Sequence, residues 1–328
     1  MLLEFTTKGI YCPKGNFYID PSVGVDFALI THGHSDHARR GSKKYLAHTD
    51  TVEILKLRLG KKIKIEGIDY KNEIKINDVN VTFFPSGHII GASQIRVSDG
   101  NEIWVVTGDY KLEDDGISQP FEHVECTHFV TESTFAKPNF QWKPQLEVFR
   151  EINDWWKENS LKGITSVISA YSLGKSQRIL KNIDADIGKI IVHSAIKETN
   201  DVVEKLGYKL PITYSYNEVN SSDLKSALII TPSFSTLKEL EDKDPNYSFA
   251  QASGWMQVRW YRSNNIDKGF VISDHADWNG LITAVKRSKA ENIFVMHGYT
   301  TYFAKYLNSI GLNARAIKPK TLNQLELF

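Results

Sequence analysis

The segment from His32 to His37 carries side chains that could bind metal ions. His32, His34, Asp36 and His37 place four potential ligands within six residues. Neutral imidazole and carboxylate groups are ligands that Zn²⁺ and Mn²⁺ take in proteins. Four ligands so close together fit one tetrahedral ion poorly, so the spacing favours two ions, one bound by His32 and His34 and the other by Asp36 and His37. The alternative is a His-rich polar surface loop, which this fixed spacing of ligand types disfavours.

The element that positions this segment is a short strand. Residues 25–30 are mostly apolar and are bounded by Pro21 and Gly24 before them and by Gly33 after them, which predicts a buried strand. The potential ligands therefore lie on the loop that leaves the strand, where Gly33 permits a tight backbone path.

Two later strands also lead into potential ligands. The apolar run at 81–85 leads through Gly87 to His88, and the run at 103–106 leads through Gly108 to Asp109. A lone histidine would more often be structural. Beside the His32–His37 segment, however, the favoured interpretation is a site that collects its ligands from several strand ends.

Composition limits the class of protein. The chain has 328 residues and 41% hydrophobic content, enough for one large or two medium domains. Its 40 basic and 39 acidic residues give a net charge of +1, so any surface for nucleic acid must be a local patch. Cys12 and Cys126 are too few for a disulfide scaffold. With no secretory signal and no membrane-length apolar run, we expect a cytoplasmic protein without a membrane partner.

The pattern of elements changes after about residue 140. Residues 143–158 show the three-to-four-residue apolar spacing of an amphipathic helix, and strand-like and helix-like segments then alternate up to residue 230. This alternation predicts a small parallel sheet in a separate α/β domain.

The motif H-x-H-x-D-H after a strand, followed by Gly87-His88 and Gly108-Asp109, resembles the signature of the metallo-β-lactamase fold. The resemblance implies an α/β (α+β) chain with an αββα sandwich and a hydrolytic metal centre at one edge of the sheets. It also implies that Asp20 supports the metal loop through hydrogen bonds. A turn-forming Asp before Pro21 fits the sequence equally well.

The phrase Glu132-Ser133-Thr134-Phe135 at a strand end narrows the resemblance to the β-CASP nucleases of this fold. That branch carries an inserted α/β cap. The resemblance therefore implies a metallo-β-lactamase domain built from residues 1–139 and 266–328 and a β-CASP cap at 140–265. The strands that lead into His275 and His297 look like the two late motifs of the branch.

The roles of the family's residues carry over to the matching positions. The expected ligands are His32, His34 and His88 for the first ion, Asp36, His37 and His297 for the second, and Asp109 for both. The resemblance implies two divalent ions, Zn²⁺ with Mn²⁺ as the alternative, that share the hydroxide which attacks phosphorus. The expected catalytic residues are Asp36, Glu132 and His275, with Glu132 orienting His275 near the departing oxygen.

Further segments resemble the bacterial ligase-associated DNA exonucleases, which accompany a DNA ligase and a helicase. These segments are residues 9–21, 173–175, 253–256 and 274–278. The implied function is metal-dependent hydrolysis of nucleic acid, with a DNA exonuclease of DNA repair favoured and a ligase or helicase complex as partner. Two alternatives stay open: a β-CASP ribonuclease in RNA processing, and a catalytically silent scaffold that binds nucleic acid.

Basic residues at two places are candidates for contacts with phosphates. Arg39 and Arg40 follow the metal loop, although such a run is usually a solvated face. Ser172, Lys175 and Arg178 lie where a predicted strand meets a predicted helix, whose N-terminus attracts anions. The alternative there is a plain turn with solvated basic residues.

Two other segments could bind a partner. Trp255 could stack on a base or belong to the core. The end of the chain resembles the short peptide that bacterial repair proteins insert into the sliding DNA clamp, a groove-binding mode with apolar anchors. The residues concerned are Gln324, Leu325, Leu327 and Phe328. The alternative is a frayed or folded-back tail.

Overall fold

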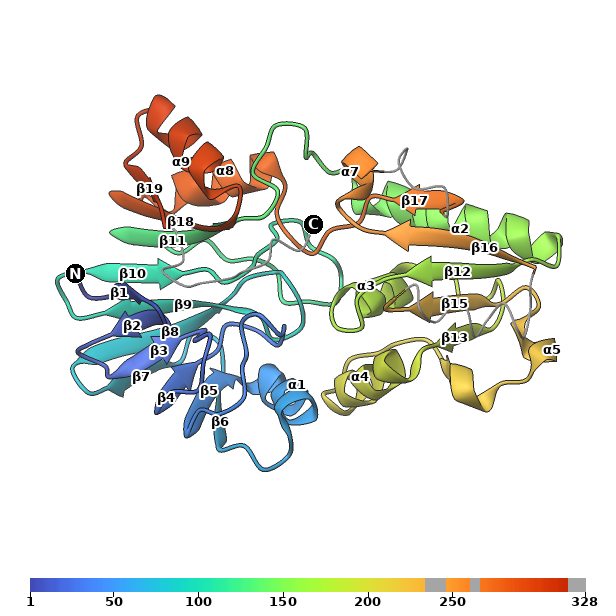
Figure 1. Ribbon diagram of the computed structural model, residues 1–328, viewed down its shortest axis with the longest axis horizontal. Helices are drawn as coiled ribbons and strands as arrows, with labels where there is room; N and C mark the ends of the chain where they lie inside the picture. The colour runs from blue at the N-terminus through green and yellow to red at the C-terminus, as the bar shows by residue number, and fades with distance from the viewer. Residues whose placement is uncertain (234–245, 260–265, 318–328) are drawn as a thin grey trace. The chain divides into compact units, whose positions relative to one another are not determined.

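The structure is a computed structural model that describes residues 1–233, 246–259 and 266–317. The chain divides into two compact units (Figure 1). Unit 1 takes in Met1–Asp114, Ser118–Pro138 and the chain from His275 onward, whereas unit 2 takes in Asp115–Ile117 and Asn139–Asp274. The mixed α/β class expected from the sequence is confirmed.

Unit 1 contains two sheets in its described part. The first has the order β1-β2-β3-β4-β5-β6, with β1 (Glu4–Thr6), β2 (Gly9–Cys12), β3 (Phe17–Ile19), β4 (Phe27–Leu29), β5 (Lys44–His48) and β6 (Ile65–Ile68). The second has the order β19-β18-β11-β10-β9-β8-β7, with β7 (Glu73–Ile76), β8 (Val79–Pro85), β9 (Ser93–Ser98), β10 (Ile103–Val106), β11 (His128–Ser133), β18 (Asn292–Gly298) and β19 (Ala314–Ala316).

The two sheets of unit 1 share one hydrophobic core. Phe17 and Leu29 of the first sheet belong to the same buried cluster as Phe83, Trp104 and Phe294 of the second. Burial of each such aromatic side chain stabilises the fold by about 1.5–3 kcal/mol. Alternate residues of the strands point to the opposite faces of the sheets, and these outer faces are covered by helices.

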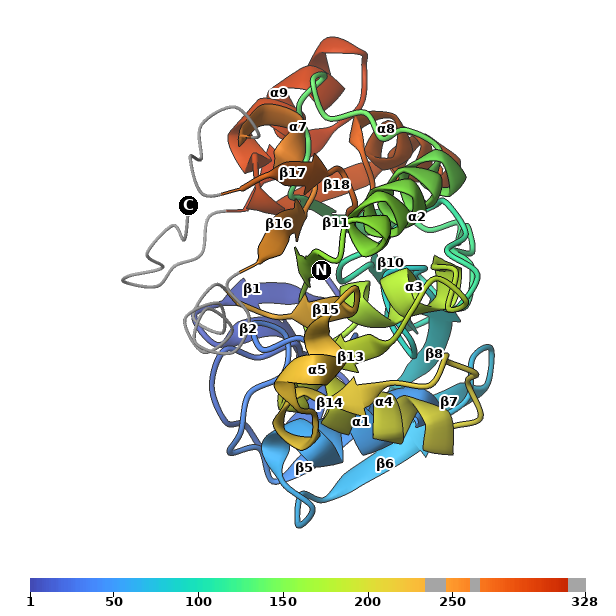
Figure 2. The ribbon, with the colours of Figure 1, turned by 90° about the vertical axis from the view of Figure 1, so that its right-hand side faces the viewer.

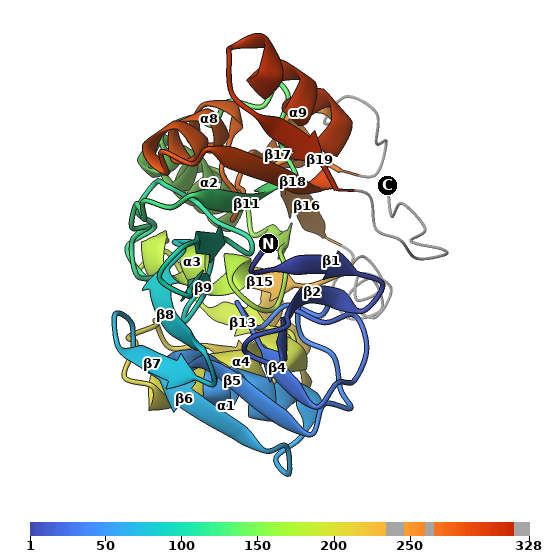
Figure 3. The ribbon, with the colours of Figure 1, turned by 90° about the vertical axis from the view of Figure 1, so that its left-hand side faces the viewer.

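Helices lie on the outer face of each sheet of unit 1 (Figure 3). Leu55 and Leu59 of α1 (Thr49–Leu59) pack with residues of the first sheet. Leu281 of α8 (Trp278–Arg287) and Phe303 of α9 (Thr300–Ser309) pack with residues of the second. Asp277 caps the start of α8 by accepting a hydrogen bond from the Gly280 N–H at 2.7 Å.

Strand direction brings several strand ends to one edge of the second sheet. β8 and β10 both pair antiparallel with β9, so they run in the same direction. β10, β11 and β18 pair in parallel. The carboxyl ends of β8, β10, β11 and β18 therefore lie at the same edge, and the residues that follow or end these strands are placed next to each other.

Unit 2 contains a sheet whose described strand pairs are all parallel, as the alternation of elements predicts. Its order is β14-β13-β15-β12-β16-β17, with β12 (Thr165–Ser169), β13 (Ile190–Val192), β14 (Tyr214–Ser215), β15 (Leu228–Thr231), β16 (Tyr247–Ala252) and β17 (Lys268–Phe270). Figure 2 shows this unit facing the viewer.

The helices of unit 2 cover both faces of its sheet. One face packs against α2 (Gln145–Leu161), α3 (Lys175–Asn182) and α4 (Ser194–Lys205). The other packs against α5 (Ser221–Leu224) and the short helix η1 (Tyr216–Glu218); α7 spans Met256–Arg259. Among the helices that the structure describes, none combines the length and the apolarity needed to cross a membrane.

Candidate metal centre

The loop after β4 carries His32, His34, Asp36 and His37, and Asp20 holds it. Asp20 Oδ1 accepts a hydrogen bond from the Thr31 N–H at 2.8 Å, and Oδ2 accepts one from Thr31 Oγ1. His37 Nδ1 lies 2.8 Å from the same Oδ2. A proton on Nδ1 of His37 is thereby bound to the carboxylate, which leaves Nε2 as the ligand atom.

Glycines allow the two later ligands to approach the loop. Gly87 has φ of +71°, and a Cβ on it would collide with the carbonyl oxygen of Lys111. Gly108 has φ of +57°, and a Cβ there would lie 2.6 Å from Thr31 Oγ1. Only glycine adopts this backbone conformation in such a tight space without strain. This explains why a glycine precedes both His88 and Asp109.

The carboxylate of Asp109 is surrounded by imidazole nitrogens. Its Oδ2 lies 3.5 Å from Nε2 of His32, 3.4 Å from Nε2 of His37 and 3.7 Å from Nε2 of His88. Nδ1 of His34 is 3.1 Å from Nε2 of His88. One ligand atom each from His32, His34, His88 and Asp109 can be chosen so that all lie within 4.8 Å of one another.

These donors fit a divalent cation on two observations. Nε2 of His32 and Nε2 of His37 are buried and have no hydrogen-bond partner among the described residues, a state that buried polar atoms in native proteins rarely show. A tetrahedral Zn²⁺ with ligands at about 2.0–2.1 Å keeps its ligand atoms about 3.3–3.4 Å apart. Three of the spacings, 3.1, 3.5 and 3.7 Å, lie around that value, and the four ligand atoms all lie within 4.8 Å of one another.

The ionisation of the cluster is consistent with cation binding. Burial lowers the pKa of His32 well below its usual value, so that its imidazole is neutral as a ligand must be. Burial would raise the pKa of Asp109, but His37 and His275 outweigh it and lower that pKa. Burial would also lower the pKa of His37, but Asp109 and Asp20 raise it. The raised pKa of His37 means that its ring holds a proton beside Asp109. A cation bound between Asp109 and His37 would take the place of this proton.

Asp36 and His297 lie farther from this cluster. Asp36 is mostly exposed, and its Oδ2 is 3.7 Å from Nε2 of His37. The ring of His297 lies 5.4 Å from that of His37. His297, the residue before the last of β18, has φ of +54°, an uncommon conformation for a residue other than glycine. Asp36 and His297 thus both lie near His37, and the binding of a second ion by these three residues stays a prediction.

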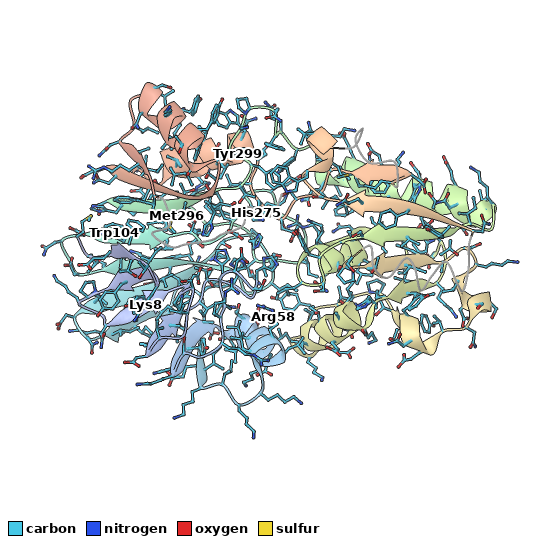
Figure 4. All side chains as sticks on the ribbon, in the orientation of Figure 1. Lys8, Arg58, Trp104, His275, Met296 and Tyr299 are labelled. Atoms are coloured by element: carbon cyan, nitrogen blue, oxygen red, sulfur yellow. The ribbon has the colours of Figure 1, made fainter. Side chains whose placement is uncertain are left out.

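Glu132 and His275 form a hydrogen-bonded pair beside Asp109. Nδ1 of His275 lies 3.0 Å and 2.9 Å from the two carboxylate oxygens of Glu132. Glu132 also accepts hydrogen bonds from the Tyr110 N–H at 2.9 Å and from the Thr134 hydroxyl. The ring of His275 lies 4.8 Å from that of His88, and Figure 4 labels His275 among the side chains.

Sequence reasoning missed three residues that position this centre. Tyr110 and Thr134 hold Glu132, and Arg58 of α1 donates a hydrogen bond to the carbonyl oxygen of Gly33 inside the metal loop. Thr134 belongs to the motif Glu132-Ser133-Thr134, so the sequence did contain a signal for its role beside Glu132. The contact of Arg58 joins residues 25 positions apart and has no local signal.

The candidate contacts with nucleic acid differ in their surroundings. Arg39 and Arg40 are exposed, and Arg40 donates to the carbonyl oxygen of Arg58 at 3.3 Å. Ser172 is half-buried, and its carbonyl oxygen accepts a hydrogen bond from Gln177. Trp255 is half-buried, with its ring 5.5 Å from that of Phe140 in an edge-on arrangement. These residues stay predictions.

The interpretation of Lys175 and Arg178 as phosphate-binding residues needs correction. Arg178 is 1% exposed and Lys175 is 4% exposed. Both pair with Asp274, and Arg178 also pairs with Asp115. Their charges are therefore used inside unit 2. The predicted clamp-binding tail, Gln324, Leu325, Leu327 and Phe328, lies outside the described residues.

No family model matches the sequence. A protein named "Probable DNA ligase" from Opitutus terrae is 28% identical over 325 residues, which are 98% of this chain and 31% of that protein. A protein named "RNase aCSPSF2" from Saccharolobus solfataricus is 27% identical over 197 residues, which are 50% of this chain and 39% of that protein. The chain thus spans well under half the length of these curated relatives.

A solved structure resembles the fold of the chain. It is a protein of unknown function from Enterococcus faecalis V583, with a TM-score of 0.61 and 13% sequence identity over 90% of this chain and 79% of that one. This likeness shows the fold alone. The sequence relatives agree with the resemblance that the motifs indicated: the chain is similar to a protein named as a probable DNA ligase and to one named as an RNase.

Proposed function

We propose that this chain is a metal-dependent phosphodiesterase that acts on nucleic acid. Unit 1 would be a metallo-β-lactamase αββα sandwich, supported by two sheets with a shared core and helices on their outer faces. Unit 2 would be the β-CASP cap, supported by its parallel sheet. The observation that carries the proposal is the carboxylate of Asp109, which lies between three imidazoles and beside the Glu132–His275 pair.

Two divalent ions would be held by the cluster around Asp109. His32, His34, His88 and Asp109 would hold one, and Asp36, His37, His297 and Asp109 would hold the other. Imidazole and carboxylate ligands favour Zn²⁺ and also accept Mn²⁺. When bound, the ions would supply Lewis acidity, which lowers the pKa of water and neutralises charge on the phosphate oxygens.

His275 would serve as the proton donor of the reaction. Because Glu132 occupies Nδ1 of His275, the opposite nitrogen, Nε2, is the one that can give a proton to the departing oxygen. The carboxylate of Glu132 favours the charged imidazolium that makes this transfer. Tyr110 and Thr134 hold Glu132 itself, so the pair has a defined orientation.

DNA is the favoured substrate, in exonucleolytic repair. The relative named as a DNA ligase matches 98% of this chain, whereas the relative named as an RNase matches 50%. A DNA ligase or helicase complex is the partner that fits this assignment, in the cytoplasm. An RNA-processing nuclease and a silent nucleic-acid-binding scaffold are the alternatives.

The test is a time course on matched substrates. Purified chain with Zn²⁺ or Mn²⁺ is incubated with end-labelled single-stranded DNA and with RNA of the same sequence. Stepwise shortening of the DNA supports the exonuclease and shows its polarity. Cleavage of RNA alone would move the chain to RNA processing, and binding without cleavage would support the scaffold.

Removing the metal should destabilise the chain. Ligand present at about a hundred times its Kd stabilises a native state by about 2.7 kcal/mol, and we therefore expect a chelator to lower Tm by roughly 5–10 °C. Differential scanning calorimetry with and without EDTA measures this shift. The His32→Ala variant is the control, because its Tm should respond less. An unchanged Tm in the wild-type chain would contradict the metal centre.

The C-terminal residues should bind the sliding clamp if the tail acts as proposed. Replacing Leu327 and Phe328 with Ala should remove binding to the bacterial clamp, because both apolar anchors are lost. Surface plasmon resonance with immobilised clamp measures this, and Gln324→Ala should weaken binding less. Equal binding by the double variant, or none by the intact chain, would refute the interaction.

A further inference from the structure

Two buried basic side chains of α3, Lys175 and Arg178, pair with acidic side chains of unit 2. The contacts of the Arg178 guanidinium include the following: Nε lies 3.1 Å from Asp115 Oδ2, Nη1 lies 3.1 Å from Asp274 Oδ1, and Nη1 donates a hydrogen bond to the carbonyl oxygen of Ser273. Lys175 Nζ lies 3.7 Å from Asp274 Oδ2. Two positive and two negative side chains are thus buried together.

Burying such a cluster costs free energy of desolvation, and the loss of any one member would leave an opposite charge buried without its partner. A charge taken out of water is tolerated only where opposite charges and hydrogen bonds surround it. The amide of Asn182 adds to the arrangement by donating to the carbonyl oxygen of Asp115 at 3.2 Å and to that of Arg178 at 2.8 Å. The cluster therefore holds the backbone of residues 115 and 273–274 firmly to α3.

The held segment leads directly into His275. Ser273 and Asp274, which Arg178 contacts, are the two residues before it. On the other side, the Ala276 N–H donates to the carbonyl oxygen of Tyr110 at 2.6 Å. Tyr110 in turn donates its own N–H to Glu132. The backbone on either side of His275 is thus fixed by hydrogen bonds and ion pairs.

We propose that Arg178 is a positioning residue for His275. With Asp115, Asp274 and Lys175 it fixes the backbone that enters His275, so that Nδ1 of the ring meets Glu132. The role of His275 in catalysis rests on the function proposed above, whereas the positioning of its ring by Arg178 does not. Lys175 and Arg178, which the sequence suggested as phosphate contacts, would thus position the backbone before His275.

Arginine suits this task better than lysine. Its planar guanidinium offers several N–H groups in a fixed geometry, so one side chain can hold two carboxylates and a carbonyl oxygen together. A lysine keeps the charge but offers a single ammonium group. The Arg178→Lys variant therefore tests geometry while it preserves charge.

The first experiment compares the steady-state kinetics of Arg178→Lys and a control, Lys181→Gln, in the full chain with its metal. Lys181 is an exposed residue of the same helix. We expect kcat of Arg178→Lys to fall on the order of tenfold to a hundredfold, the effect of a small misplacement of a reacting group. KM should stay unchanged, metal content should stay at the wild-type value, and Lys181→Gln should behave as wild type.

The opposite pattern would overturn the proposal. If Arg178 contacted the nucleic-acid backbone, Arg178→Gln would raise KM and lower the salt dependence of binding by about one charge with kcat unchanged. The proposal would also be overturned if the Arg178→Lys and Arg178→Gln variants both kept the wild-type kcat.

A second measurement needs no turnover. Spectra of ¹⁵N-labelled histidine side chains report the hydrogen bond at Nδ1 of each ring, and the His275 signal is assigned by its loss in His275→Ala. We expect Arg178→Lys to shift this signal and Lys181→Gln to leave it in place. An unmoved signal in Arg178→Lys would overturn the positioning role. A shifted signal in a chain that cleaves nothing would support that role and count against the proposed function alone.

A variant in which the whole charge cluster is replaced keeps the proposal testable even if a single substitution prevents folding. The four-fold variant Lys175→Met, Arg178→Met, Asp115→Leu and Asp274→Leu replaces the buried charges with apolar side chains, a change that proteins often accept. We expect this variant to fold and still to show the shifted His275 signal. A wild-type signal would show that the cluster does not position His275.

Discussion

Replacing Asp109 with alanine should abolish hydrolysis of phosphodiesters, with a fall in kcat/KM of at least about a thousandfold. Its Oδ2 lies 3.4–3.7 Å from the Nε2 atoms of three histidines. Without it, the imidazoles lose the negative charge that offsets a bound cation, and the proposed pair of ions loses its shared ligand. Kinetics on end-labelled single-stranded DNA, with metal content from plasma mass spectrometry, measure both losses.

A matched acidic control separates this effect from a general loss of charge. Asp78 is exposed in the turn between β7 and β8, and Asp78→Ala should keep activity and metal content. Asp109→Asn keeps the size of the side chain and should also be inactive. Activity of Asp109→Ala within tenfold of the wild type would refute the role given to Asp109.

Replacing His275 with alanine should slow hydrolysis by about 10²–10⁴-fold while the metal is retained. Its ring is bound to Glu132 through Nδ1 and lies 4.8 Å from the ring of His88. The variant loses a proton donor, and its activity should depend less on pH because one titrating group is gone. The kcat–pH profile and the metal content of the variant test this together.

Two variants show whether the effect belongs to the pair. Glu132→Gln should also lower kcat, because a neutral amide favours the imidazolium less than a carboxylate does. His123→Ala changes a histidine outside the cluster and should leave the kcat–pH profile unchanged. If His275→Ala lost its metal along with its activity, the residue would be a ligand, and the assignment as proton donor would be wrong.

The parts of the fold that local pattern determines could be predicted from the sequence. The sequence predicts a helix over Thr49–Leu59, and α1 has the same bounds, because its apolar spacing and its acidic first turn are local features. The sequence also predicts a hairpin around Lys14-Gly15, and the structure has the antiparallel pair β2–β3 there. The parallel sheet expected from alternating elements is present in unit 2.

Other elements depend on contacts that local pattern does not show. The sequence predicts a helix over residues 198–206. α4 begins four residues earlier, at Ser194, because Nδ1 of His193 accepts a hydrogen bond from the Ala195 N–H and so caps the helix. Histidine is not among the residues that usually signal such a cap. The strand Tyr247–Ala252 was not predicted. It pairs with β17 and with β12, which lies about eighty residues earlier in the chain.

The site could be predicted as a set of residue types but not as a geometry. The motif spacing indicated His32, His34, His88 and Asp109, and the structure brings their donor atoms together. The motifs did not indicate which other residues hold the site in place. Arg178 stands at a helix start with the pattern of an anion site, yet Asp115, which it contacts, lies 63 residues away. Only the folded chain shows that its charge is already paired.

The measurement that tests the central claim most directly is a metal titration of the metal-free chain with cleavage as readout. Zn²⁺ or Mn²⁺ is added in steps while bound metal and the rate of phosphodiester hydrolysis are measured in the same sample. We predict that hydrolysis reaches its maximum at about two bound ions per chain and stays absent in Asp109→Ala at every step. Nucleic acid that binds the chain but stays intact at full metal loading would contradict the account.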